Sequence, residues 1–286
     1  MRALLGAPLS PLPNPLPEGV GTQETAMLEA KNITVNYGPR AAVASVSLLP
    51  KPGEVIAIIG PNGAGKSTFL RALNGALPVS RGQVLLDGNP LSSFARRAVA
   101  RHIAVVAQES DLRFPVTVME FVLGGRHAWT TAWGWETERD VGIARAVLRE
   151  TELEDFAARF MNELSGGERQ RAVLARALAT EAGVFLLDEP TANLDLAHQA
   201  TMLRLVRARC DDRSAAAVVV THDVNLAAEF ADRVLLMKEG RAIAIGPPAK
   251  VLTPELLRKV FDLEVLVDAH PISGAPRITP VHERPE

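Results

Sequence analysis

The apolar positions of this chain form short, continuous runs that alternate with segments of helical spacing. Three of the runs predict strands, at residues 54–60, 183–188 and 216–221. A run that is apolar on both faces is typical of a strand buried in a parallel sheet. Helical patterns accompany these runs at residues 67–77, 165–179 and 196–209. The alternation of buried strands with helices predicts an α/β fold with a largely parallel sheet.

The rest of the pattern predicts further strands and a helical region. Residues 33–37 alternate between apolar and polar, and residues 43–49 are rich in strand-forming side chains. Residues 82–88 close on Asp-Gly, which favours a tight hairpin turn. A short apolar strand is expected at 102–107, and residues 110–164 are expected to be mainly helical.

The first 26 residues differ in composition from the patterned sequence that follows. Residues 8–17 contain five prolines, which supply no backbone donors to a sheet or helix. Residues 1–26 are therefore predicted to be a proline-rich, disordered extension, and residues 27–286 the folded domain. The apolar run at the N-terminus is cut short by proline, so a signal peptide is not expected.

Composition narrows the functional classes. The chain has 286 residues, is 47% apolar, and carries 31 basic against 33 acidic residues. This balance offers no basic field for a nucleic-acid partner. The single cysteine, Cys210, excludes an internal disulfide and fits a reducing compartment. No apolar run approaches the roughly 20 residues of a spanning helix, so a cytoplasmic protein is expected.

A phosphate-binding motif directly follows the first buried run. The segment matches the pattern G-x-x-x-x-G-K-[ST] and lies between a predicted strand and a predicted helix. Its glycines let backbone N–H groups wrap phosphates, Lys66 can reach the β- and γ-phosphates, and the Ser67 hydroxyl can bind Mg²⁺. The motif predicts ATP and Mg²⁺ as ligands, with these contact residues: Gly60, Pro61, Asn62, Gly63, Ala64, Gly65, Lys66, Ser67 and Thr68.

Two further motifs complete the candidate chemistry. The second buried strand ends in Asp188 and Glu189, placed to hold the Mg²⁺ shell and to take a proton from an attacking water. A capped strand end would give the same residues, so this pair is informative only beside the phosphate loop. Ser165, Gly166 and Gly167 then open a helix, which predicts a second anion site at its N-terminus. Capping by Ser165 with Glu168 is expected as well, but it does not explain the paired glycines.

With these three motifs in order, residues 28 to about 250 resemble the ATP-binding cassette (ABC) family, to which the segment 164–170 is specific. The resemblance implies an α/β fold, with a P-loop NTPase (RecA-like) core and an antiparallel β sub-domain. It also implies an inserted α-helical sub-domain at about 109–164 and a C-terminal tail at about 251–286. Further positions match family residues: Tyr37, Gln108, Asp195 and His222.

The resemblance gives each of these positions a role. Tyr37 would stack on adenine, although a strand aromatic in the core would look the same in sequence. Gln108 would sense Mg²⁺ and γ-phosphate, Asp195 would communicate across a dimer, and His222 would contact γ-phosphate. Glu189, His222 and Gln108 are thus the expected catalytic residues, and the expected metal ligands are Ser67, Gln108 and Asp188.

The same resemblance implies partners. Two copies would form a head-to-tail homodimer in which each ATP lies between residues 60–68 of one chain and 165–167 of the other. Residues 114–121 resemble the stretch that importers place against a membrane permease, so a peripheral location at the cytoplasmic face of the membrane is expected. A periplasmic or extracellular substrate-binding protein would act indirectly. Trp129, Trp133 and Trp135 could belong either to this interface or to the core of the sub-domain.

The cargo class rests on the C-terminal sequence. Residues 195–199 and 246–261 are similar to the ATPases of iron–siderophore, haem and cobalamin importers, and residues 267–277 to the siderophore and cobalamin branch. An importer ATPase for a metal-chelate cargo is therefore expected. The alternative is a soluble ABC ATPase of the iron–sulfur cluster assembly type, which residues 114–121 and the tail disfavour.

Overall fold

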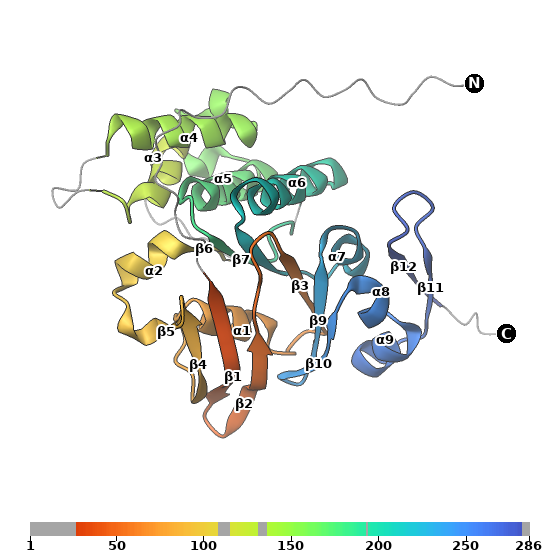
Figure 1. Ribbon diagram of the computed structural model, residues 1–286. Helices are drawn as coiled ribbons and strands as arrows, with labels where there is room; N and C mark the ends of the chain where they lie inside the picture. Colours follow the sequence, from red (N-terminus) through yellow and green to blue (C-terminus); the bar gives the residue numbers. More distant parts are fainter. Residues whose placement is uncertain (1–26, 108–114, 131–135, 193, 282–286) are drawn as a thin grey trace, which may run out of the picture.

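In its described residues, the computed structural model contains two large sheets with helices packed around them and a two-stranded hairpin near the C-terminus, as Figure 1 shows. It describes residues 27–107, 115–130, 136–192 and 194–281. The predicted proline-rich extension at 1–26 lies outside these stretches. Within them, no helix combines the length and the apolar character needed to cross a membrane.

The larger sheet has six strands in the order β10–β9–β3–β8–β7–β6. Their bounds are Arg241–Gly246 (β10), Arg233–Lys238 (β9), Val55–Ile59 (β3), Ala216–Val220 (β8), Val184–Asp188 (β7) and Ile103–Val106 (β6). All neighbouring pairs are parallel except the antiparallel pair β9–β10. Every residue of β3, β7 and β8 is buried, as their continuous apolar runs predict.

The smaller sheet is antiparallel, with the order β2–β1–β4–β5. Its strands are Arg40–Leu48 (β2), Leu28–Tyr37 (β1), Arg81–Leu86 (β4) and Asn89–Pro90 (β5). The turn between β4 and β5 is Asp87-Gly88, with φ values of 51° and 76°. Positive φ at both central residues is the geometry that Asp-Gly favours, so the predicted hairpin turn is present.

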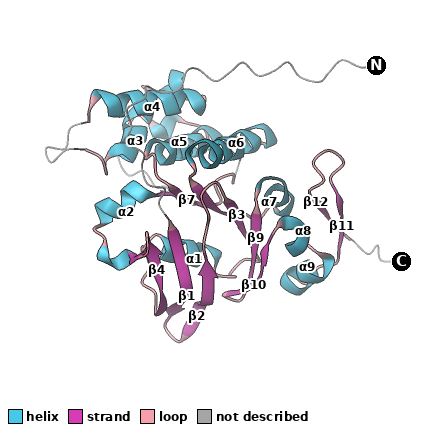
Figure 2. Ribbon diagram, in the orientation of Figure 1, coloured by secondary structure: helices cyan, strands magenta, loops and turns pink. Residues whose placement is uncertain are grey.

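Successive side chains of β3 point to opposite faces of the larger sheet, so an apolar cluster lies on each face. Val55, Ala57 and Ile59 join a cluster with the helices on one face, while Ile56 and Ile58 join a second cluster on the other. The second cluster includes α1 (Lys66–Leu73) and the inner face of the smaller sheet. Figure 2 shows the two sheets on either side of α1.

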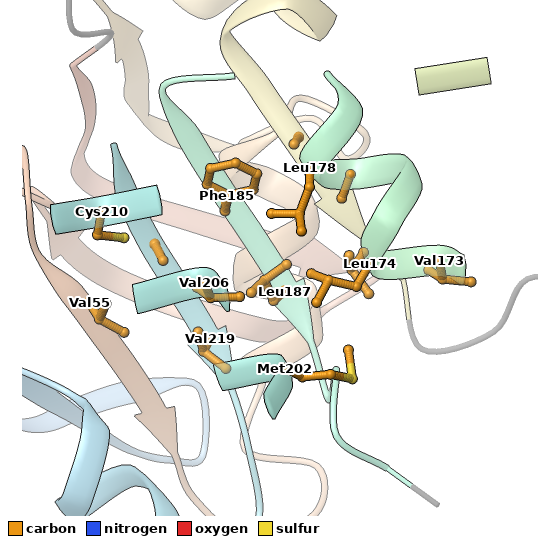
Figure 3. Packing of buried hydrophobic residues seen from close by; sticks show 14 of the residues in the cluster. Val55, Val173, Leu174, Leu178, Phe185, Leu187, Met202, Val206, Cys210 and Val219 are labelled. Carbon is orange, nitrogen blue, oxygen red and sulfur yellow. The ribbon is translucent and has the colours of Figure 1, made fainter. Parts of the chain in front are cut away.

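The first cluster is built mainly by α5 (Gly166–Ala179) and α6 (Leu196–Arg213) on the strands of the large sheet. Figure 3 shows this packing at close range: Leu174 and Leu178 of α5 and Met202 and Val206 of α6 face Phe185 and Leu187 of strand β7. Cys210 is fully buried there, and burial raises the pKa of its thiol to about 12. This cysteine is therefore a small apolar side chain of the core.

A helical region separates β6 from α5. Its helices are α3 (Val118–Leu123) and α4 (Glu138–Glu150), with short 3-10 turns at Gly124–Arg126, Glu154–Phe156 and Met161–Glu163. Both helices begin with a capping box, Thr117 with Glu120 and Thr137 with Asp140. The described part of residues 110–164 is therefore mainly helical, as predicted. Before β6 the chain adds two elements that were not predicted, the 3-10 turn Leu91–Ser93 and helix α2 (Arg96–His102).

Beyond Thr221 the chain is more regular than its sequence pattern indicates. Helix α7 (Val224–Phe230) leads into β9 and β10, and two short helices follow, α8 (Pro248–Val251) and α9 (Pro254–Phe261). The described chain closes with an antiparallel hairpin of β11 (Val265–Ala269) and β12 (Pro276–Pro280). Figure 1 places this hairpin beside α7, at the edge of the molecule.

Candidate active site

The loop between β3 and α1 has a backbone that only glycine adopts readily. Gly63 and Gly65 have φ values of 77° and 93°. Gly65 directly precedes α1, and within the described part of the chain that helix receives no side-chain cap. The first N–H groups of α1 therefore remain available to a ligand, and the helix dipole makes an anion the favoured one.

Glycine is also required because other backbone segments press on the loop. A Cβ at Gly60 would lie 2.1 Å from the carbonyl oxygen of Met237, and one at Gly65 would lie 2.2 Å from that of Ala42. Gly240 donates its N–H to the Ala64 carbonyl at 3.0 Å. The turn at Gly240 thus supports the loop from nearly 180 residues away. Sequence spacing carries no signal for this contact.

Lys66 lies folded onto the loop that carries it. Its Nζ donates to the carbonyl oxygens of Gly60 at 2.8 Å and Pro61 at 3.2 Å, and the residue is 6% exposed. Burial lowers the pKa of the ammonium, while the charges of Glu189 and Asp188 oppose that shift. The ammonium is thus held at the loop, close to where phosphate oxygens would lie.

Ser67 and Asp188 place two oxygen atoms side by side. The Ser67 hydroxyl donates to Asp188 Oδ1 at 3.0 Å, joining α1 to the end of β7. Asp188 is 3% exposed, and burial raises the pKa of its carboxyl. A carboxylate and a hydroxyl on rigid elements fit a small, hard cation such as Mg²⁺, whose charge would offset the cost of burying Asp188.

Glu189 and His222 come together where two parallel strands end. Glu189 follows β7 and His222 lies just beyond β8, and His222 Nε2 is 2.5 Å from Glu189 Oε1. The Glu189 backbone has a φ of 52° and donates its N–H to the Val220 carbonyl. A left-handed glutamate costs about 1–3 kcal/mol and points to a functional constraint on where its carboxylate lies.

The phosphate loop, Glu189 and His222 surround one cavity of about 560 Å³, and Asp188 lies behind its lining, hydrogen-bonded to Ser67. Its lining residues are Asn62, Gly63, Ala64, Gly65, Lys66, Ser67, Thr68, Glu189 and His222. The volume lies within the range of small-molecule sites. The cavity combines backbone donors and a cation with a carboxylate–imidazole pair, so it can hold a polyphosphate and place a proton acceptor beside it.

The helix end predicted as a second anion site lies apart from this cavity. Ser165 caps α5 and shares a capping box with Glu168, as predicted, and these hydrogen bonds lower the pKa of Glu168. A Cβ at Gly167 would lie 3.3 Å from Leu194, so the helix end packs against the segment that follows Glu189. Gln170 also donates to the Pro190 carbonyl at 2.9 Å. Among the described residues, the cavity lining includes no member of the 165–167 segment.

The remaining predicted residues lie outside the cavity lining. Tyr37 ends β1 and is 54% exposed, which excludes the core alternative and leaves its ring open to a planar ligand. Asp195 caps α6 and accepts the His198 N–H at 2.9 Å, a hydrogen bond that lowers the pKa of its carboxyl. Gln108 lies outside the described residues, so its predicted metal contact has no structural counterpart here.

Trp129 packs within the helical region. Its indole N–H donates to the Thr180 carbonyl at 2.9 Å, and the guanidinium groups of Arg101 and Arg126 lie 5.2 and 5.3 Å from its ring. Trp129 is thus half-buried and held in place by these three residues, and Trp133 and Trp135 lie outside the described residues.

Comparison with known proteins identifies the family. Residues 43–192 match the family model described as ABC transporter. The chain is 46% identical over 257 residues to the hemin import ATP-binding protein HmuV of Pseudomonas fluorescens, covering 88% of this chain and 99% of that protein. It is 44% identical over 234 residues to the cobalamin import ATP-binding protein BtuD of Halobacterium salinarum, covering 82% of this chain and 58% of that protein. The chain thus spans somewhat more than half the length of BtuD.

Two solved structures extend the comparison. One is described as an inward-facing conformation of a proposed metal-chelate type ABC transporter. It matches with a TM-score of 0.77 and 27% identity, covering 91% of this chain and 98% of that one. The other is described as a dimeric structure of a bacterial ABC transporter cassette. It matches with a TM-score of 0.70 and 31% identity, covering 77% of this chain and 98% of that one. The predicted fold class is confirmed, and the chain belongs to the ABC transporter family.

Proposed function

We propose that this chain is the ATP-hydrolysing subunit of an ABC importer and powers uptake of a metal-chelate cargo. The observation that supports this proposal is the cavity lined by the phosphate loop, Glu189 and His222, with Asp188 hydrogen-bonded to Ser67 of its lining. The names of the similar hemin and cobalamin import proteins support the direction of transport and the cargo class. Iron–siderophore, haem and cobalamin complexes are the candidate cargoes.

In the proposed mechanism, the loop holds ATP and Glu189 acts on water. The N–H groups of residues 63–68 and the Lys66 ammonium bind the phosphates, and Tyr37 stacks on the adenine. Ser67 and Asp188 would hold Mg²⁺, which supplies positive charge to the β- and γ-phosphates when bound. Glu189 accepts the proton of the attacking water, and His222 orients the Glu189 carboxylate through its 2.5 Å contact.

The proposed working unit is a head-to-tail homodimer. Among the described residues, the N-terminus of α1 lines the cavity, whereas the N-terminus of α5, with residues 165–167, does not. A second copy would bring its residues 165–167 over the phosphates held by residues 60–68, with Asp195 near the shared boundary. Residue 166 suits this role, because a Cβ built there meets nothing within 4 Å among the described residues. The similar cassette whose structure is described as dimeric supports the pairing of two copies.

We place the permease contact in a groove between the core and the helical region. The groove has a volume of about 740 Å³ and lies between α2 and β6 on one side and α3 and α5 on the other. Its lining combines basic side chains with an apolar floor: Arg96, Arg97, His127, Arg176, Val105, Phe121 and Val173. Val105 is 42% exposed there. An exposed apolar floor beside cations suits a short amphipathic helix of a membrane partner.

Affinity purification of the tagged chain from gently solubilised membranes tests this proposal. Recovery of a many-helix permease is expected, and uptake of labelled haem, cobalamin and ferric siderophore by that complex would identify the cargo. Val105→Asp should lose the permease while retaining ATP binding. Ile272→Asp, at a residue that is 91% exposed on the C-terminal hairpin, is the matched control and should retain both. Recovery of soluble scaffold proteins alone would move the function to the iron–sulfur assembly class.

A further inference from the structure

The C-terminal hairpin is hydrogen-bonded along one face of the helix that follows His222. Asn225 Nδ2 donates to the Ile278 carbonyl at 3.1 Å, and the Ile278 N–H donates to Asn225 Oδ1 at 2.7 Å. One turn further along α7, Glu229 Oε2 accepts the Ser273 hydroxyl at 2.7 Å. Asn225 and Glu229 are four residues apart, so both contacts lie on the same face of α7.

The two hydrogen bonds between Asn225 and Ile278 resemble the pairing of two strand residues. The amide gives one donor and one acceptor to the two backbone groups of a single residue, which fixes position and direction together. Ile278 is itself anchored, since it is 8% exposed and belongs to the large apolar cluster, against which Val265 and Val267 of β11 also pack. The hairpin is therefore a firm support that ties α7 to the core.

Helix α7 needs such a support. It has seven residues; its buried side chains are the small Ala227 and Ala228, and Val224 and Phe230 pack against the large apolar cluster while only partly buried. So small a buried face fixes a short helix only weakly through packing alone. The N-terminus of α7 is joined directly to the active site: Asp223 caps it by accepting the Leu226 N–H at 2.8 Å, and the preceding residue is His222. Any shift of α7 therefore displaces the imidazole that contacts Glu189.

We propose that the C-terminal hairpin positions His222 for ATP hydrolysis, through the hydrogen bonds between Asn225 and Ile278. Asn225 is a positioning residue, because it is not among the residues that line the cavity. The phosphate loop packs closely against the backbone of Met237 and Ala42 and is hydrogen-bonded to Gly240, none of which belongs to α7 or the hairpin. Loosening the hairpin should therefore slow turnover and leave nucleotide binding intact. This inference rests on the proposed ATPase function.

The test is steady-state ATP hydrolysis by the full chain carrying Asn225→Ala. We expect kcat to fall by about tenfold, as for a catalytic group displaced by a fraction of an ångström, with the KM for ATP within a factor of two. Asn225 is an exposed residue, so the variant should fold, and its melting temperature is measured alongside. Arg277→Ala is the matched control: it removes the Asp268 ion pair from the same hairpin without touching α7, and its kcat should stay near that of the unaltered protein.

Each result has a distinct meaning. A lower kcat at unchanged KM in Asn225→Ala, and not in Arg277→Ala, is the expected outcome. An unchanged kcat in Asn225→Ala, or a KM that rises in proportion to the loss of kcat, would overturn the positioning role. Equal losses in both variants would show that only the general stability of the hairpin matters, which also overturns it. No hydrolysis by the unaltered protein would instead refute the proposed function, and this inference with it.

Discussion

Replacing Gly65 by alanine should strongly destabilise the nucleotide-free protein, for two separable reasons. The φ of 93° places the residue in a left-handed region that costs a non-glycine residue about 1–2 kcal/mol. The added Cβ would also lie 2.2 Å from the Ala42 carbonyl oxygen and 3.4 Å from the Cα of Gly240. Both neighbours are backbone atoms that cannot rotate away, so overpacking adds about 1–3 kcal/mol. The expected loss in free energy of unfolding is roughly 2–5 kcal/mol.

The same loop supplies the control. Gly63 has a φ of 77°, but a Cβ built there meets nothing within 4 Å in the described part of the chain. Gly63→Ala should therefore lose only the conformational part, about 1–2 kcal/mol. Urea unfolding without nucleotide, followed by circular dichroism, measures both variants. Equal midpoints for Gly63→Ala and Gly65→Ala would refute the reasoning that Ala42 and Gly240 press on the loop.

Three further substitutions address the chemistry. Glu189→Gln should bind ATP normally and hydrolyse it at least about 100-fold more slowly, because the proton acceptor is lost while the loop remains; normal turnover in a phosphate-release assay would remove Glu189 from the mechanism. Lys66→Ala should weaken ATP binding by about 10- to 100-fold in a fluorescent-nucleotide titration, and unchanged affinity would contradict the phosphate-loop role. Burial raises the pKa of Asp188, so ionisation above its ordinary pKa of 3.8 opposes folding of the nucleotide-free protein. Asp188→Asn should therefore raise the melting temperature at pH 7 while abolishing Mg²⁺-dependent hydrolysis; an unchanged or lower melting temperature would show that burial of the charge is not costly.

The parts of the fold that local chemistry dictates could be predicted from sequence. The buried strands β3, β7 and β8 were predicted because continuous apolar runs need cover on both faces. The capping box at Ser165 follows from residues three positions apart. Helix α1 ends at Leu73, short of the predicted 77, because Gly75 adopts a φ of 72° that breaks the helical pattern. Boundaries of this kind depend on backbone torsions that apolar spacing does not reveal.

What sequence could not give is the set of contacts between distant segments. Gly240 supports the phosphate loop, and Asn225 pairs with Ile278, across long stretches of sequence. The identity of a glycine or an asparagine does not indicate which distant residue it will contact. The hairpin of β11 and β12 was likewise unpredicted, since its apolar positions are few and become meaningful only against the core. For Tyr37 the structure excludes one of the two alternatives that the sequence left open, because an exposed ring is not part of the core.

The most direct test of the account is the mass of the Glu189→Gln variant with and without Mg·ATP, measured by light scattering. One chain has a mass of 30.7 kDa. We predict that the mass of the Glu189→Gln variant doubles only when ATP is present. Adding Gly166→Asp should keep the protein folded, since an acidic residue suits the first turn of α5, yet it should prevent the doubling by placing a negative charge against the partner's phosphates. A protein that binds ATP and stays monomeric, or a dimer that forms equally with Gly166→Asp, would contradict a nucleotide site shared between two copies.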